Sequence, residues 1–279
     1  MTDYGTVDEF VGVVKAVVRE LAPHVGFIDL THQIPVFDIR AGALTLARSV
    51  QYLPSGVVMA IVDPGVGTAR RAIAIEVAGG EGILIGPDNG LLAPAVAMAG
   101  GAERSVVLDN PEFHLEAAGA TFAGRDIFAP VAAHLCNGVD LTAVGTEIDA
   151  GLLLPSVVPL PRTEQGVLVC EVMWIDHYGN AQLNVGPSDL DVEWGPGWGD
   201  RVRVQVGDHI RSMPVVAAFA DLAPSAPGLV LDSYGMLAIS IDRFSAAAEM
   251  KLGVTDQVIL QPTAEIDAPS TPVQLRIER

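Results

Sequence analysis

The chain has 279 residues, half of them hydrophobic, and a formal net charge of −18. This length suits one large domain or two ordinary ones. The acidity argues against non-specific binding to nucleic acid, for which lysine and arginine must neutralise phosphates, and no apolar run approaches the roughly 20 residues that a membrane span needs.

The first half of the chain alternates runs typical of helices with runs typical of strands. It opens with a loop at 2–5 and a helix at 11–21; such a loop usually follows a strand, so either one precedes residue 1 or the sheet lacks it. The other expected elements are a strand at 25–31, a helix at 39–52, strands at 57–62, 72–77 and 82–85, a helix at 91–98, a strand at 106–108 and a helix at 128–135. This alternation predicts an α/β domain with a mostly parallel sheet.

The pattern changes at a proline-rich stretch, residues 154–161. We expect a linker at 155–164 between an α/β domain, residues 1–154, and a second domain, residues 165–279. Helical periodicity is not evident beyond the linker. Strands are expected at 166–175, 201–206, 209–216, 229–231, 236–241 and 256–260. Short strands separated by Gly, Pro and Asp are typical of a small all-β domain, either a barrel or a sandwich.

The cysteines and histidines give no sign of a metal site. Cys136 and Cys170 lie in apolar segments without metal-ligand spacing, and the six histidines are scattered. We expect buried free thiols in a reducing cytoplasm. No secretory signal is recognisable at the start of the sequence, which also favours a cytoplasmic location.

The most distinctive stretch is Asp63-Pro64-Gly65-Val66-Gly67-Thr68-Ala69-Arg70-Arg71. It follows an apolar run that predicts a buried parallel strand, and ligands of open α/β sheets bind at the carboxyl ends of strands. Proline and glycine force a tight turn and let the backbone approach a ligand closely. Asp63 and Arg70 are thus expected to converge on one small volume. The alternative is a purely structural turn closed by an Asp–Arg ion pair.

Other polar residues also fall at predicted strand ends and turns. Each of them alone is more often a cap or turn residue, because Asp and Asn side chains bond nearby backbone groups. Their density at one sheet edge favours a site for a polar ligand. The set comprises Asp3, Asp8, Asp63, Arg70, Asp88, Asn89, Arg125, Asp126, Asp176, Asn180 and Asn184.

Seven short motifs, taken together and in order, resemble one enzyme family. They are Thr2-Asp3-Tyr4-Gly5, Asp29-Leu30-Thr31-His32, Val62-Asp63-Pro64-Gly65-Val66-Gly67-Thr68, Gly86-Pro87-Asp88-Asn89-Gly90, Thr121-Phe122-Ala123-Gly124-Arg125-Asp126, Ile175-Asp176-His177-Tyr178-Gly179-Asn180 and Asp232-Ser233-Tyr234-Gly235. The chain resembles the S-adenosyl-L-methionine (SAM) hydroxide adenosyltransferases, or SAM hydrolases, which are related to fluorinase and chlorinase. The resemblance covers nearly the whole chain.

The resemblance implies a Rossmann-like N-terminal α/β domain, a C-terminal β-barrel, and a homotrimer whose active sites lie between subunits. It implies that water or hydroxide attacks C5′ of SAM and releases adenosine and L-methionine. SAM is then the substrate and no cofactor is needed. The chemistry is reasonable because a sulfonium is already a good leaving group, so that positioning and partly desolvating the water is what remains.

The resemblance also assigns roles to single residues. Asp3 would hold the ribose diol, since a carboxylate can accept two hydroxyl hydrogen bonds. Asp8 and Asp176 would bind the methionine ammonium, and Ser233 its carboxylate. The remaining substrate-binding positions are Asn180 on the adenine edge, Phe219 stacked on the adenine ring, Phe37 and Tyr178 as pocket walls, and Gly124. For Phe37 and Phe219, plain core packing is the alternative.

In this family an Asp, an Arg and a His hold the water, and the sequence matches only two of them. Asp63 and Arg70 match the first two, whereas the position of the His is Ala123. Ala123 is either an engineered inactivating change, a natural residue with solvent filling the gap, or a sign of drift to a slow enzyme or a binder.

Loss of one such group typically costs about two to four orders of magnitude in rate, so we expect measurable but poor turnover. Two other functions stay open: a halide-using adenosyltransferase, against which Asp63 and Gly124 count, and a non-catalytic SAM- or adenosine-binding protein.

Overall fold

The computed structural model describes residues 1–156 and 158–263 and divides into two compact units, residues 1–158 and a unit that begins at Pro159. Val157, in the predicted linker, and residues 264–279, in the predicted second domain, lie outside the described residues. Residues 162–164 were also expected in the linker but form strand β6, which pairs with the first long strand of the second unit.

The first unit is built on a five-stranded sheet with the order β1-β3-β2-β4-β5. The strands are β1 (Gly56–Met59), β2 (Ala72–Val77), β3 (Gly82–Pro87), β4 (Arg104–Val107) and β5 (Thr146–Glu147). Only β1 and β3 pair in parallel; the other three pairings are antiparallel. The sheet is mixed, so the expectation of a mostly parallel sheet is wrong. Only residues 78–81 separate β2 from β3, and a parallel connection needs a crossover of a dozen or more residues.

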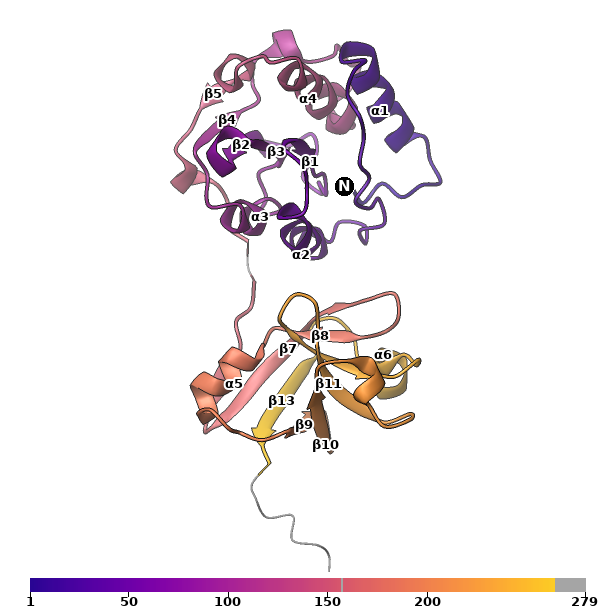
Figure 1. Ribbon diagram of the computed structural model, residues 1–279. Coiled ribbons are helices and arrows are strands. Elements are labelled where there is room, and N and C mark those ends of the chain that lie inside the picture. Colours follow the sequence, from indigo (N-terminus) through magenta and orange to yellow (C-terminus); the bar gives the residue numbers. More distant parts are fainter. Residues whose placement is uncertain (157, 264–279) are drawn as a thin grey trace, which may run out of the picture. The chain divides into compact units, whose positions relative to one another are not determined.

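Helices cover both faces of this sheet, as expected for an α/β unit. Figure 1 shows α1 (Phe10–Leu21) and α4 (Ala129–Cys136) on one side and α2 (Ile39–Val50) and α3 (Ala93–Met98) on the other. All four were predicted from apolar spacing, with ends that differ by a few residues. A π-helical turn, Gly124–Phe128, leads into α4, and such turns are frequent at functional sites.

The predicted strand at 25–31 is absent from the structure, and the N-terminal segment lies beside the sheet in its place. Residues 25–31 are irregular and include exposed Phe27 and Ile28. Their partner is the N-terminal segment, which bonds this region at two points: Thr2 N–H donates to Thr31 O at 3.1 Å, and Gly5 N–H donates to His32 O at 2.8 Å. With so few ladder bonds and so little burial, the apolar pattern alone does not produce a strand.

The N-terminal segment instead lies alongside the chain that continues β1. Thr2 forms an isolated parallel bridge with Ile61, and Asp3 N–H donates to Ile61 O at 3.3 Å. Residues 1–2, β1 with its extension to 62, and β3 thus run in the same direction. The residues that follow them, Asp3, Asp63 and Asp88, therefore all lie at the same edge of the sheet.

The second unit is a closed β-barrel. The chain order around the sheet is β13-β9-β10-β11-β12-β8-β7-β6, and a further pairing of β13 with β7 closes seven of these strands into the barrel. A barrel, as the resemblance implies, is therefore confirmed over a sandwich. The strands are β6 (Arg162–Glu164), β7 (Val167–Ile175), β8 (Ala181–Leu183), β9 (Arg201–Val206), β10 (His209–Val216), β11 (Pro227–Leu231), β12 (Leu237–Ile241) and β13 (Gln257–Pro262).

Two short helices interrupt what was expected to be an all-β unit. They are α5 (Pro187–Trp194) and α6 (Ala246–Met250). Each buries a single side chain fully, Leu190 in α5 and Ala246 in α6. Helices of eight and five residues span too few turns for a 3.6-residue apolar period to stand out in the sequence.

An ion pair at the sheet edge ties the end of the first unit to its sheet. Arg71 pairs with Asp88, whose side chain is only 2% exposed. The Asp88 carboxylate also accepts the Leu154 N–H at 2.9 Å, and the Arg71 guanidinium donates to Leu152 O at 2.5 Å. Asp88 was a candidate for ligand binding, but its carboxylate is held by the protein itself.

Replacing Arg71 by Ala is expected to lower the free energy of unfolding by about 3 kcal/mol, because it leaves the buried Asp88 charge unpaired. Arg162→Ala is the matched control, since Arg162 is 67% exposed beside Glu164 and such surface pairs contribute about 0–1 kcal/mol. Urea unfolding followed by circular dichroism measures both. Equal stability of the two variants would contradict the structural role of the Arg71–Asp88 pair.

Candidate functional site

A pocket of about 260 Å³ in the first unit gathers five of the residues that the sequence singled out. They come from the N-terminal segment, the turn before α2, the end of the β1 extension and the turn before α4. The five are Asp3, Phe37, Asp63, Ala123 and Gly124. Arg70 joins them through its ion pair with Asp63.

Asp63 and Arg70 do converge as expected. Arg70 donates from Nε to Asp63 Oδ1 at 3.0 Å and from a terminal nitrogen to Oδ2 at 2.5 Å. The side chains are only 6% and 11% exposed, and the Arg70 guanidinium lies over the Phe128 ring, 5.6 Å from its centroid. This two-point contact fixes the direction of the carboxylate and places a positive charge beside it.

The turn between the two residues is close-packed. Thr68 Oγ1 donates to Gly65 O at 2.7 Å and accepts the Arg70 N–H at 3.3 Å. Gly67 has φ +76°, and a Cβ there would lie 2.9 Å from Ala120 O. Only glycine tolerates both conditions. The turn is thereby pressed against the 120–124 segment, which supplies the other side of the pocket.

Burial raises the pKa of the Asp63 carboxyl, while the Arg70 guanidinium opposes the shift and the Asp3 carboxylate adds to it. Two carboxylates facing one pocket next to a single arginine form a site that attracts cationic groups. A ligand that carries a positive charge near its reacting atom suits this arrangement.

Asp3 and Phe37 are held by one hydrogen bond. The Phe37 N–H donates to Asp3 Oδ2 at 2.9 Å, and Phe37 has φ +65°, a conformation that is uncommon for a bulky residue. The Phe37 ring is exposed, so it is no core residue, contrary to the packing alternative. Such backbone strain is tolerated where the surrounding structure over-determines it, often at a functional site.

Ala123 and Gly124 begin the π-helical turn. Ala123 is buried against the core and lines the pocket without any hydrogen-bonding side chain. A Cβ on residue 124 would lie 2.4 Å from the Tyr4 hydroxyl oxygen. Glycine at 124 therefore allows the phenol of Tyr4 to reach the pocket wall.

Several expected site residues of the first unit do not line this pocket. Asp8 is exposed just before α1. Arg125 pairs with its neighbour Asp126, donating from Nε to Oδ1 at 2.6 Å. The Asn89 amide donates to Val62 O at 2.9 Å and its oxygen accepts the Leu91 N–H, so Asn89 braces the strand end.

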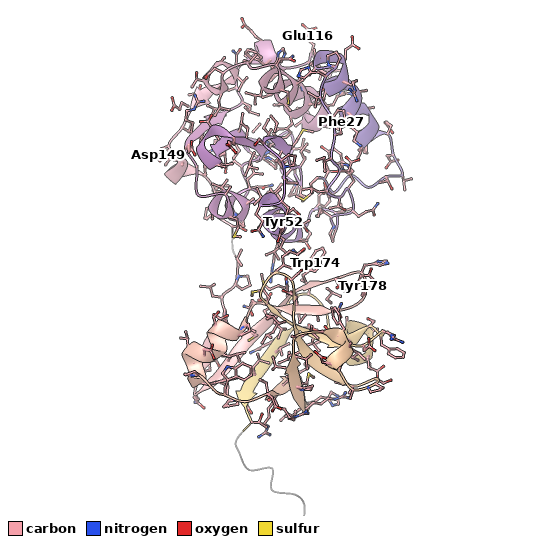
Figure 2. The ribbon with its side chains drawn as sticks, in the orientation of Figure 1. Phe27, Tyr52, Glu116, Asp149, Trp174 and Tyr178 are labelled. Atoms are coloured by element: carbon pink, nitrogen blue, oxygen red, sulfur yellow. The ribbon has the colours of Figure 1, made fainter. Side chains whose placement is uncertain are left out.

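The expected residues of the second unit lie on two loops of similar geometry. Asp176 Oδ1 accepts the N–H groups of Tyr178 and Asn180, both at 2.9 Å, and Oδ2 accepts the Asn180 amide at 2.8 Å. Figure 2 shows the Tyr178 side chain projecting from this loop between β7 and β8. Asp176 and Asn180 are thus brought together, while Tyr178 is left exposed.

The second loop, between β11 and β12, repeats the first. Asp232 Oδ1 accepts the N–H groups of Tyr234 and Met236, at 2.8 and 3.0 Å. Ser233 is therefore exposed on a rigid turn. Phe219 begins a short 3-10 turn and is 46% exposed, which argues against its being a core residue. Asn184 is a structural residue, because its amide donates to Pro159 O and its oxygen accepts the Glu171 N–H.

Sequence reasoning missed several residues that line the pocket, namely Tyr4, Phe10, Val36, Val66, Thr121 and Phe122. Tyr4, Val66, Thr121 and Phe122 stand inside motifs that carried the resemblance, so their positions gave a signal. Phe10 had none, because it reaches the pocket from α1 only through tertiary packing.

In the described part of the chain no cluster of His, Cys, Asp or Glu residues could hold a metal ion, and no helix is long and apolar enough to cross a membrane.

Comparison with known proteins decides the family. The sequence model of the SAM hydroxide adenosyltransferase N-terminal domain matches residues 1–145, and that of the C-terminal domain matches residues 170–259. The chain belongs to the SAM hydroxide adenosyltransferase family. Its sequence resemblance to that family is thereby confirmed.

Among its relatives in this family, the (R)-S-adenosyl-L-methionine hydrolase of Salinispora tropica is 43% identical over 94% of this chain and 96% of that protein. A fluorinase of an Actinoplanes species is more distant, 28% identical over 86% of this chain and 89% of its own. A crystal structure of an uncharacterised conserved protein from Thermotoga maritima superposes with a TM-score of 0.84 at 32% identity, over 93% of this chain and 98% of that one.

Proposed function

We propose that this protein hydrolyses SAM to adenosine and L-methionine. The observation that carries the proposal is the buried, two-point Asp63–Arg70 pair at the wall of an acidic pocket, in a chain whose nearer relatives are named as hydrolases of this substrate. Asp63 offers a carboxylate to a water molecule, where a halide site would place no second negative charge.

In the proposed reaction a water oxygen attacks C5′ of SAM. The C5′–O bond forms as the C5′–S bond breaks, and the sulfur keeps the bonding pair, so the sulfonium becomes the neutral thioether of methionine. The water proton passes to the Asp63 carboxylate and then to solvent. Arg70 fixes the direction of that carboxylate toward the attacking water. The pocket removes bulk water that would otherwise solvate the nucleophile.

The remaining roles complete the proposal. Asp3 binds the ribose diol through Oδ1, since Oδ2 already accepts the Phe37 N–H, and Phe37 forms a wall. Asp8 and Asp176 bind the ammonium, Ser233 the carboxylate, Asn180 the adenine edge and Phe219 its face, with Tyr178 as a second wall. The protein works without a cofactor as a cytoplasmic homotrimer whose sites combine the N-terminal domain, ending near 154, of one subunit with the C-terminal domain, beginning near 165, of a neighbour.

Liquid chromatography of the purified protein incubated with SAM tests this function. Adenosine and methionine in equal amounts, released at a rate independent of added chloride or fluoride, are expected. A 5′-halo product that requires halide would assign the chain to the halide adenosyltransferases instead. Bound, unreacted SAM would mark it as a binding protein.

A further inference from the structure

We propose that the Tyr4 hydroxyl is a third water-positioning group in this site, acting beside Asp63 and Arg70. This inference rests on the proposed hydrolysis of SAM and adds to it a residue from a different segment of the chain. Tyr4 lines the same pocket as Asp63 and Ala123, and its hydroxyl lies against the backbone of Gly124.

The Tyr4 ring has little freedom to move. It packs edge-to-face against Phe10 and Phe122, with centroid distances of 5.8 and 5.9 Å. Its backbone is fixed as well, because the Tyr4 N–H donates to Thr2 Oγ1 at 3.2 Å and Thr2 Oγ1 lies 2.9 Å from His32 Nδ1. A side chain so restrained presents its hydroxyl in one direction, as a positioning group must.

A short chain of polar contacts extends from His32 and supports the backbone of the 2–5 loop. His32 Nε2 lies 3.1 Å from Asp29 Oδ1, and Lys15 Nζ donates to Asp29 Oδ2 at 2.6 Å. The Asp29-Leu30-Thr31-His32 motif, which no step of the reaction uses directly, thereby acquires a role. It holds the 2–5 loop, and with it Asp3 and Tyr4, at the edge of the pocket.

The hydroxyl has the chemistry that the role requires. Burial raises the pKa of Tyr4, the carboxylates of Asp3 and Asp63 raise it further, and Arg70 opposes them. The phenol therefore stays protonated and is a hydrogen-bond donor at neutral pH. Within residues 1–156 and 158–263 the structure records no hydrogen-bond partner for this hydroxyl, so it is available to a molecule in the pocket.

The side chain of Ala123 does not compete with the Tyr4 hydroxyl for a water molecule. Its methyl group neither donates nor accepts a hydrogen bond, and it lines the same wall as Gly124. A water placed between Asp63 and this wall can donate to the Asp63 carboxylate and accept from the Tyr4 hydroxyl. Its remaining lone pair is then free to attack C5′.

The first test is Tyr4→Phe, which keeps the ring and its packing and removes only the hydroxyl. We expect kcat for adenosine release to fall about 10²-fold, as for loss of one positioned donor, with KM nearly unchanged because the hydroxyl acts on water and not on SAM. Tyr52→Phe is the control, since Tyr52 is exposed just after α2 and outside the pocket (Figure 2). Gly124→Ala, whose Cβ would displace the hydroxyl, is expected to lower kcat in the same direction.

The second test combines Tyr4→Phe with Ala123→His. If an imidazole and the phenol serve the same water, the His substitution raises kcat about 10²-fold in the Tyr4→Phe protein and by clearly less in the parent. An equal gain in both backgrounds would overturn the role of Tyr4. Equal kcat values for an active parent and for the Tyr4→Phe protein would also overturn it. A parent that releases no adenosine at all would instead overturn the proposed function.

Discussion

Asp63→Asn is expected to lower kcat for adenosine release by about 10³-fold, within the range for loss of a general base. An amide of the same shape no longer accepts a proton from water and no longer balances the Arg70 guanidinium, which is 11% exposed. KM for SAM should change far less, because the carboxylate acts mainly in the transition state. Steady-state kinetics by chromatography measures both constants.

Asp149→Asn is the matched control for this substitution. Asp149 caps a short 3-10 turn, accepting the Gly151 N–H at 2.8 Å, and does not line the pocket. Asn is an equally good cap, so this variant should match the parent in rate. Equal rates for Asp63→Asn and the parent would refute the assignment of Asp63.

The pH dependence gives an independent view of the same carboxyl. Since burial raises its pKa, activity should fall with acid at a pH above the ordinary Asp value of about 3.9. The effect of pH on the free energy of unfolding has the opposite sign. A pKa that is higher in the folded than in the unfolded state means that protonation favours folding. The ionised carboxylate therefore lowers stability at neutral pH, and this cost disappears as pH falls through the folded-state pKa. Asp63→Asn should remove the acid limb from the residual rate.

Ala123→His is expected to raise kcat about 10-fold, less than a general acid–base group usually contributes, because Tyr4 already supplies one hydrogen bond. The pocket of about 260 Å³ that Ala123 lines leaves room for an imidazole. Initial rates of adenosine release from saturating SAM measure the change.

Ala118→His places the same side chain at an exposed position of the same loop and should leave kcat unchanged. If circular dichroism shows that the Ala123→His protein is folded and its rate does not exceed that of the parent, the three-group arrangement of Asp63, Arg70 and residue 123 is wrong. A gain shared by Ala118→His would assign the effect to an added histidine anywhere in this loop and not to the pocket.

The local features of the chain were predictable because they depend on residues close in sequence. Apolar spacing located α1, α2, α3 and α4 and most strands of both units. Proline and glycine between Asp63 and Arg70 predicted a turn that brings the two side chains together, and the structure confirms their pairing. Ordered motifs were enough to identify the family.

Other features needed the tertiary structure, because contacts between distant residues decide them. Strand direction in the first sheet follows from which strands become neighbours, so a mixed sheet replaced the parallel one. The apolar run at 25–31 lacks ladder partners and stays irregular. Above all, Tyr4 and Asp63 stand far apart in sequence, and only the packing of residues 1–3 along the β1 extension brings the phenol into the pocket. The sequence thus determined the Asp63–Arg70 pair, whereas long-range packing determined that Tyr4 lines the same pocket as Asp63.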